Sequence, residues 1–172
     1  MAPRVVLVGL PGAGKSTVGA RLARQLPAEF ADSDQLVVRQ AGRSVPEIFA
    51  ADGEAVFRQL EAEVIASALT DFDGVLALGG GAVTTVSVRR NLVSSGVPVV
   101  LLTAGEDDLL QRMSGSRHRP LLAGDPAAKP AELAQAREPL YREVATATVP
   151  TGGRSVAEVA DELRAQLIGQ HS

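Results

Sequence analysis

Residues 9–17 read Gly-Leu-Pro-Gly-Ala-Gly-Lys-Ser-Thr and directly follow the apolar run Val5-Val6-Leu7-Val8. This is the complete G-x-x-x-x-G-K-[ST] pattern of a phosphate-binding loop, placed after a predicted strand and before a predicted helix. In such a loop the glycines let consecutive backbone N–H groups turn toward a polyphosphate, and the helix that follows adds its dipole. Lys15 would reach the outer phosphates, and Ser16 would present its hydroxyl to Mg²⁺. The sequence therefore predicts nucleotide binding.

Composition narrows the class of protein further. The chain has 172 residues, of which 45% are hydrophobic and 22% charged, which is typical of one soluble globular domain. A net charge of −3 does not favour nucleic acid or a membrane surface as a partner. The absence of cysteine excludes disulfides and thiolate metal sites, and no apolar stretch approaches a membrane span. We expect a single cytoplasmic domain over residues 1–172 that works as a monomer.

Apolar runs alternate with helical patterns along the chain. The first helical pattern, Lys15–Leu26, places Val18, Leu22 and Leu26 on one face, and Pro27 ends it. Strands that are apolar throughout and alternate with helices predict a parallel sheet covered on both faces. The predicted strands are Arg4–Val8, Glu29–Asp32, Val75–Leu78, Pro98–Thr103 and Thr146–Val149.

Two insertions exceed what a minimal α/β domain needs. Helical patterns near 35–41, 45–51 and 54–69 separate the second strand from the third, and Ser44 with Glu47 forms a capping-box pattern. Residues 114–129 are rich in Gly, Arg, Pro and Ala with weak periodicity, which is typical of a lid over an active site. Both insertions favour a small-molecule kinase over a nucleotide switch.

Two aspartates end the second predicted strand in the sequence Asp32-Ser33-Asp34. If this segment is extended, both carboxylates share one face and lie at the carboxyl edge of the sheet, where ligands bind. One could help to hold Mg²⁺ and accept the proton of an attacking hydroxyl, and the other could bind acceptor hydroxyls. The alternative is that Asp34 only caps the next helix. Because no aspartate directly follows the third or fourth strand, Asp32 is the best candidate for the metal-side carboxylate.

Arg58 and Glu61 are three residues apart on a predicted helix and are therefore neighbours. The residues alone favour an exposed salt bridge, and the alternative is that Glu61 orients Arg58 toward the carboxylate of a substrate. Gly79-Gly80-Gly81 follows the third strand, where three glycines permit close approach by a ligand or unusual dihedral angles. Arginines with possible phosphate or substrate roles, all of which could instead be solvated, are Arg112, Arg119, Arg137 and Arg154.

Taken together, these motifs resemble the shikimate kinase family over nearly the whole chain. The matching segments, in family order and spacing, are 9–17 GLPGAGKST, 32–34 DSD, 42–49 GRSVPEIF, 57–61 FRQLE, 79–83 GGGAV, 119–122 RPLL and 137–142 REPLYR. The resemblance implies a P-loop kinase with a three-layer α/β/α fold and a five-stranded parallel sheet of order 2-3-1-4-5. It also implies a helical substrate-binding insertion at about 33–61 and a mobile lid at about 114–129.

The resemblance implies a reaction and a set of site residues. The family uses Mg²⁺ and transfers the γ-phosphoryl group of ATP to the 3-hydroxyl of shikimate, on the route to chorismate and aromatic amino acids. Lys15, Asp32 and Arg119 would be catalytic, and Ser16 and Asp32 would lie at the metal. Nucleotide contacts would come from Gly12, Ala13, Gly14, Lys15, Ser16, Thr17, Arg112, Arg119 and Arg154. Shikimate contacts would come from Asp34, Arg58, Gly79, Gly80, Gly81 and Arg137.

Three other functions compete with this prediction. The first is a kinase of another hydroxylated acceptor, such as gluconate or a nucleoside monophosphate. The second is a non-catalytic protein that binds ATP and changes its interactions. The third, a GTPase switch, lacks the guanine-reading N/T-K-x-D sequence. An acceptor panel separates the first from shikimate kinase, and acceptor-stimulated ADP release separates the second.

Overall fold

The computed structural model describes residues 2–9, 14–103 and 130–169, and for 130–135 and 169 it describes the backbone only. Five parallel strands form one sheet in the order β2-β3-β1-β4-β5, which confirms the predicted order. The central strands β1 and β3 are buried along their whole length, as their apolar sequences predict. The strands are β1 (Val5–Val8), β2 (Glu29–Asp32), β3 (Gly74–Ala77), β4 (Val99–Thr103) and β5 (Ala147–Pro150).

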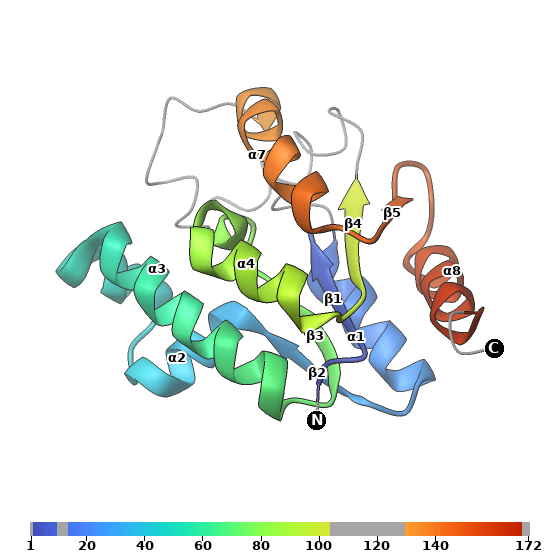
Figure 1. The fold of residues 1–172 in the computed structure, drawn as a ribbon, viewed down its shortest axis with the longest axis horizontal. Coiled ribbons are helices and arrows are strands. Elements are labelled where there is room, and N and C mark those ends of the chain that lie inside the picture. The colour runs from blue at the N-terminus through green and yellow to red at the C-terminus, as the bar shows by residue number, and fades with distance from the viewer. Residues whose placement is uncertain (1, 10–13, 104–129, 170–172) are drawn as a thin grey trace.

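Helices cover both faces of this sheet, so the molecule has three layers (Figure 1). Alternate strand residues point to opposite faces: Val6 and Leu76 belong to one core, and Leu7 and Val75 belong to the other. Helices α3, α4 and α7 close the first core, and α1 and α8 close the second. The helices are α1 (Lys15–Gln25), α2 (Ser33–Ala41), α3 (Val45–Asp71), α4 (Val86–Ser95), α7 (Pro130–Val144) and α8 (Val156–Gly169), with a 3₁₀ turn η1 (Ala82–Thr84).

Helix α3 spans both of the predicted helices 45–51 and 54–69, which meet at a kink. Its start is the predicted capping box: the Glu47 N–H donates to Ser44 Oγ at 3.3 Å, and that hydroxyl donates to the Glu47 carboxylate at 3.0 Å. Inside the element, Gly53 has φ 87° and ψ 173°, a non-helical conformation that divides α3 into two helical stretches at a kink.

In the part of the chain that the structure describes, no helix is both long enough and apolar enough to cross a membrane. The segment predicted as a lid, 114–129, lies outside the described residues.

The kink at Gly53 yields a prediction about stability. Its backbone conformation is essentially restricted to glycine, and a Cβ added there would meet no atom within 4 Å. We expect Gly53→Ala to lower the free energy of unfolding by about 1–3 kcal/mol, through backbone strain alone. Urea unfolding followed by circular dichroism measures this loss.

Gly42→Ala is the matched control for that experiment. Gly42 also lies in open space, but its φ of 71° and ψ of 15° fall in the left-handed helical region, which other residues visit more readily. The loss should therefore be smaller than for Gly53→Ala. An equal or larger loss at Gly42 would contradict the assignment of strain to Gly53.

Candidate active site

The described part of the phosphate-binding loop is built as its sequence predicts. Gly14 caps α1 with φ 88° and ψ 20°, a left-handed conformation that favours glycine. Lys15 is only 9% exposed, and its Nζ donates to the Gly9 carbonyl at 2.7 Å. The ammonium group is therefore held over the entrance of the loop, at the N-terminus of α1. Gly12 and Ala13 lie outside the described residues.

Ser16 and Asp32, which the sequence predicts at a metal, lie in direct contact. The Ser16 hydroxyl donates to Asp32 Oδ2 at 2.9 Å, which joins the first turn of α1 to the end of β2. A hydroxyl and a carboxylate at this spacing fit Mg²⁺, which takes oxygen ligands and keeps several waters or phosphate oxygens. Among the described residues no group of three His, Cys, Asp or Glu side chains could hold a metal by itself.

Asp34 is not extended, so the geometric premise used for it in the sequence analysis is wrong. Helix α2 already begins at Ser33, because Asp32 caps it: Asp32 Oδ1 accepts from the Asp34 N–H at 2.8 Å. The alternative that Asp34 is the cap is also wrong, since Asp32 has that role. The Asp34 carboxylate nevertheless lies at the carboxyl edge of the sheet, where Oδ1 is 2.9 Å from the position of a Cβ built on Gly79.

Arg58 and Glu61 form a buried ion pair, so the exposed salt bridge that the residues alone favoured is wrong. Arg58 Nη1 lies 2.9 Å from Glu61 Oε1, and the two side chains are 13% and 0% exposed. The Arg58 guanidinium carbon also lies 5.3 Å from the centre of the Phe57 ring. The physical reason is helix pitch: Phe57, Glu61 and Val64 share the face of α3 that packs on the core.

Burial sets the electrostatics of this pair. Burial raises the pKa of Glu61 from 4.5 to about 7, while the adjacent Arg58 lowers it and the nearby Asp34 carboxylate raises it further. Arg137 also lowers this pKa, so the charge of that arginine reaches the same cluster. Two carboxylates and two guanidinium groups from α2, α3 and α7 therefore share one region of the site.

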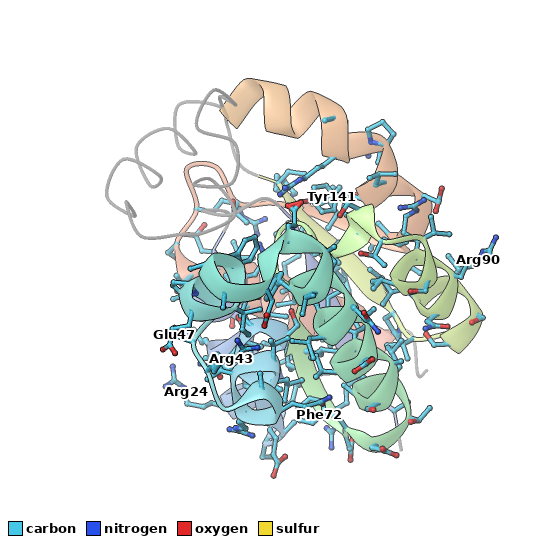
Figure 2. All side chains as sticks on the ribbon, turned by 90° about the vertical axis from the view of Figure 1, so that its left-hand side faces the viewer. Arg24, Arg43, Glu47, Phe72, Arg90 and Tyr141 are labelled. Atoms are coloured by element: carbon cyan, nitrogen blue, oxygen red, sulfur yellow. The ribbon has the colours of Figure 1, made fainter. Side chains whose placement is uncertain are left out.

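Arg137 and Tyr141 come from α7, the helix that follows the predicted lid. Arg137 is 9% exposed, and its Nη1 has no hydrogen-bond partner among the residues that the structure describes. Such a buried guanidinium nitrogen calls for an anionic or polar ligand. Tyr141, labelled beneath α7 in Figure 2, donates its hydroxyl to the carbonyl of Gly80. Burial raises its pKa to about 12, an effect that Arg137 partly offsets, so the phenol remains a donor.

The glycine turn after β3 has two anchors that the sequence analysis missed. Besides the Tyr141 hydroxyl on Gly80, the Gly79 N–H donates to the buried hydroxyl of Ser33 at 2.8 Å. Two signals could have pointed to them. Ser33 lies between the two candidate aspartates, and Tyr141 is the only tyrosine of the chain and lies in the REPLYR segment.

Arg154 has a visible local role. It donates to the Pro150 carbonyl at 2.9 Å and pairs with Glu162 at 3.2 Å, which ties the end of β5 to α8. Arg112 and Arg119 lie outside the described residues, so the structure places neither of these two predicted nucleotide contacts.

A five-stranded parallel sheet of this order, with a phosphate-binding loop after β1 and acidic and basic side chains gathered at the same edge, defines an ATP-dependent kinase of the P-loop class. The family model for shikimate kinase matches residues 11–168. The chain therefore belongs to the shikimate kinase family.

Individual relatives agree with this assignment. The chain is 50% identical to the shikimate kinase of Mycobacterium ulcerans over 97% of this chain and 90% of that protein. It is 46% identical to the shikimate kinase of Rhodococcus erythropolis, over 97% and 98% of the two chains. Among solved structures, that of Acinetobacter baumannii shikimate kinase in complex with shikimate matches with a TM-score of 0.89 and 38% identity, covering 100% of this chain and 95% of that one.

The raised pKa of Glu61 yields a pH prediction. Between pH 4.5, the ordinary pKa of a glutamate, and a pH of about 7, the raised pKa in the folded protein, Glu61 is more often protonated in the folded than in the unfolded chain. The stability contributed by Glu61 is therefore fully present at low pH and is lost as the pH rises through about 7. We expect the free energy of unfolding of the wild-type protein, relative to Glu61→Gln, to fall by about 1–3 kcal/mol between pH 5 and pH 8.

Urea unfolding at several pH values checks this expectation. Glu63→Gln, at an exposed position of the same helix, is the matched control for loss of a charge. Parallel pH profiles for the wild-type protein and Glu61→Gln would show that Glu61 does not titrate in this range.

Proposed function

We propose that the carboxyl edge of the sheet transfers the γ-phosphoryl group of ATP to the 3-hydroxyl of shikimate, giving shikimate 3-phosphate and ADP. This is the step that leads toward chorismate and the aromatic amino acids. One observation carries the proposal. The largely buried guanidinium groups of Arg58 and Arg137 both lower the pKa of Glu61. They lie at the edge of the sheet that also carries the Ser16–Asp32 contact, next to the phosphate-binding loop.

The nucleotide side of the site begins at the N-terminus of α1. Backbone N–H groups of the loop bind phosphate oxygens, and Lys15 moves from the Gly9 carbonyl onto the outer phosphates. Ser16 and Asp32 would hold Mg²⁺, which supplies neutralisation of phosphate charge when it is bound. Nucleotide contacts are assigned to Gly12, Ala13, Gly14, Lys15, Ser16, Thr17, Arg112, Arg119 and Arg154, with Arg119 on the transferring group.

The acceptor side uses charge in a different way. Shikimate carries one carboxylate, which a planar guanidinium can bind through two parallel hydrogen bonds. Arg58 is already fixed by Glu61, and Arg137 has a buried nitrogen without a hydrogen-bond partner among the described residues, so together they would form the carboxylate site. Asp34 and the backbone of Gly79, Gly80 and Gly81 bind the ring hydroxyls and so orient the molecule.

Catalysis then depends on positioning and on charge. Asp32 already accepts two hydrogen bonds, from the Asp34 N–H and the Ser16 hydroxyl. A carboxylate has about four acceptor positions, so Asp32 can also take a hydrogen bond from the attacking hydroxyl. It would orient that hydroxyl and receive its proton. Lys15 and Arg119 stabilise the charge that spreads over the transferring phosphoryl group.

The setting of this reaction is part of the proposal. The cytoplasm supplies ATP, and we place the enzyme there as a monomer.

The acceptor preference has a direct test. We expect ADP release from ATP and Mg²⁺ to rise strongly on addition of shikimate and to stay near its background with gluconate or nucleoside monophosphates. A coupled assay for ADP measures this, and Lys15→Ala, which removes the ammonium group from the phosphates, should abolish the stimulation. Stimulation by gluconate instead would identify a different acceptor. ATP binding without any stimulation would favour a non-catalytic binding protein.

The role of Arg58 has a separate test. Arg58→Ala removes charge-assisted hydrogen bonds to the carboxylate, each worth about 1.5–3 kcal/mol. We therefore expect the KM for shikimate to rise by about 10- to 100-fold while the KM for ATP changes little. Steady-state kinetics with each substrate varied in turn measures both constants.

Arg43→Ala is the matched control, because Arg43 lies before the same helix but pairs with the partly exposed Asp52 at 2.6 Å. It should leave both constants unchanged. If Arg58→Ala raised the KM for ATP as much as that for shikimate, Arg58 would not be a carboxylate ligand.

A further inference from the structure

The turn that joins β3 to η1 contains three consecutive glycines, Gly79, Gly80 and Gly81, and the backbone at Gly81 does not require a glycine. None of the three has a positive φ, and Gly81 has φ −97° and ψ 1°. An alanine can adopt these angles without strain. At Gly81 the need for glycine must therefore come from space and not from conformation.

The space at Gly81 is filled by the side chain of Arg58. A Cβ built on Gly81 would lie 2.2 Å from Arg58 Nη2 and 2.7 Å from the guanidinium carbon. Both distances are far below van der Waals contact, so a methyl group and the guanidinium cannot occupy their present positions together. The plane of Arg58 thus packs directly against the backbone of the turn.

Other contacts fix the same guanidinium. Its Nη1 is paired with Glu61 at 2.9 Å, and its central carbon lies 5.3 Å from the Phe57 ring. Two hydrogen bonds hold the glycine turn: the Tyr141 hydroxyl donates to the Gly80 carbonyl, and the Gly79 N–H donates to the Ser33 hydroxyl. Because the glycine turn and the Arg58 guanidinium are both held by other contacts, the protein itself sets the distance between them.

We propose that Gly81 is a positioning residue of the acceptor site: its missing side chain leaves the space in which the Arg58 guanidinium lies, and so sets where the carboxylate of the acceptor is bound. This inference rests on the proposed role of Arg58 as a carboxylate ligand. It differs from the assignment of the turn as a backbone ligand, because Gly81 acts here through Arg58.

The substitution Gly81→Ala tests the proposal. The three atoms nearest to the added methyl group all belong to the guanidinium end of the Arg58 side chain and none to the backbone, so Arg58 has to leave its present position while the backbone can stay in place. Displacing Arg58 weakens its charge-assisted hydrogen bond to the carboxylate, worth about 1.5–3 kcal/mol, so we expect the KM for shikimate to rise by about 10- to 100-fold. The KM for ATP should not change. Calorimetry of shikimate binding gives the same loss without turnover.

A double-mutant cycle with Arg58→Lys identifies the route of this effect. An ammonium group keeps the charge opposite Glu61 but lacks the flat guanidinium head, so it leaves room for the methyl group. We expect Arg58→Lys to raise the KM for shikimate by itself, and Gly81→Ala to add little in the Arg58→Lys background. This non-additivity is the signature of an effect transmitted through Arg58.

Other outcomes of the cycle overturn the proposal in distinguishable ways. If Gly81→Ala costs the same factor in both backgrounds, or costs nothing in the wild-type background, Gly81 does not act through Arg58. If Arg58→Lys leaves shikimate binding unchanged, the carboxylate role of Arg58 fails, and the inference falls with it. Should Gly81→Ala alone fail to fold, a folded double variant that binds like Arg58→Lys supports the proposal, and an unfolded one overturns it.

Gly96→Ala is the control for a general loss of stability. Gly96 ends α4 with φ 74°, and a Cβ built there meets no atom within 4 Å. Alanine at this position is strained and should lower the melting temperature without changing the KM for shikimate. A rise in KM for Gly96→Ala equal to that for Gly81→Ala would show that destabilisation alone explains the effect and would overturn the proposal.

Discussion

The carboxylate of Glu61 is fully buried, and the proposed acceptor side of the site depends on how its charge is compensated. An isolated carboxylate is costly to bury, so the helix that carries it needs a cation close by, and Arg58 supplies one from the same helix. Once paired, Arg58 is no longer a mobile surface side chain. It becomes a rigid donor group of defined position, pressed against the glycine turn after β3. The ion pair that lowers the cost of burying Glu61 therefore also fixes the position of the Arg58 guanidinium.

The same logic connects α7 to the rest of the site. Tyr141 binds the carbonyl of Gly80, and Arg137 lies one helical turn earlier on the same face. The turn after β3 therefore has Arg58 on one side and is tied to the helix of Arg137 by a buried hydrogen bond. The spacing between the two guanidinium groups is set by the protein before any ligand arrives, which reduces the ordering that binding must impose.

The strands could be predicted because they are short apolar runs with clear ends, whereas their order in the sheet was implied by the family resemblance. Even the edge strand β5, which includes Pro150, was placed within one residue, since a proline is tolerated at the edge of a sheet. Contacts that depend on tertiary packing were harder to predict. Helical spacing made Arg58 and Glu61 neighbours, but only the packing of α3 on the core shows that they are buried. Likewise, the side-chain bond by which Asp32 starts α2 decides that Asp34 is helical and not extended.

The residues proposed to bind the acceptor come from segments far apart in the chain, around positions 34, 58, 80 and 137, and this has a consequence for dynamics. None of these segments can form the site alone, so opening of α2, α3 or α7 would each release the ligand. A molecule that binds only when all are in place acts as a brace across the domain. Its binding free energy is added to the cost of opening every one of these elements. Occupancy by shikimate should therefore slow amide hydrogen exchange together in helices that share no sequence neighbourhood.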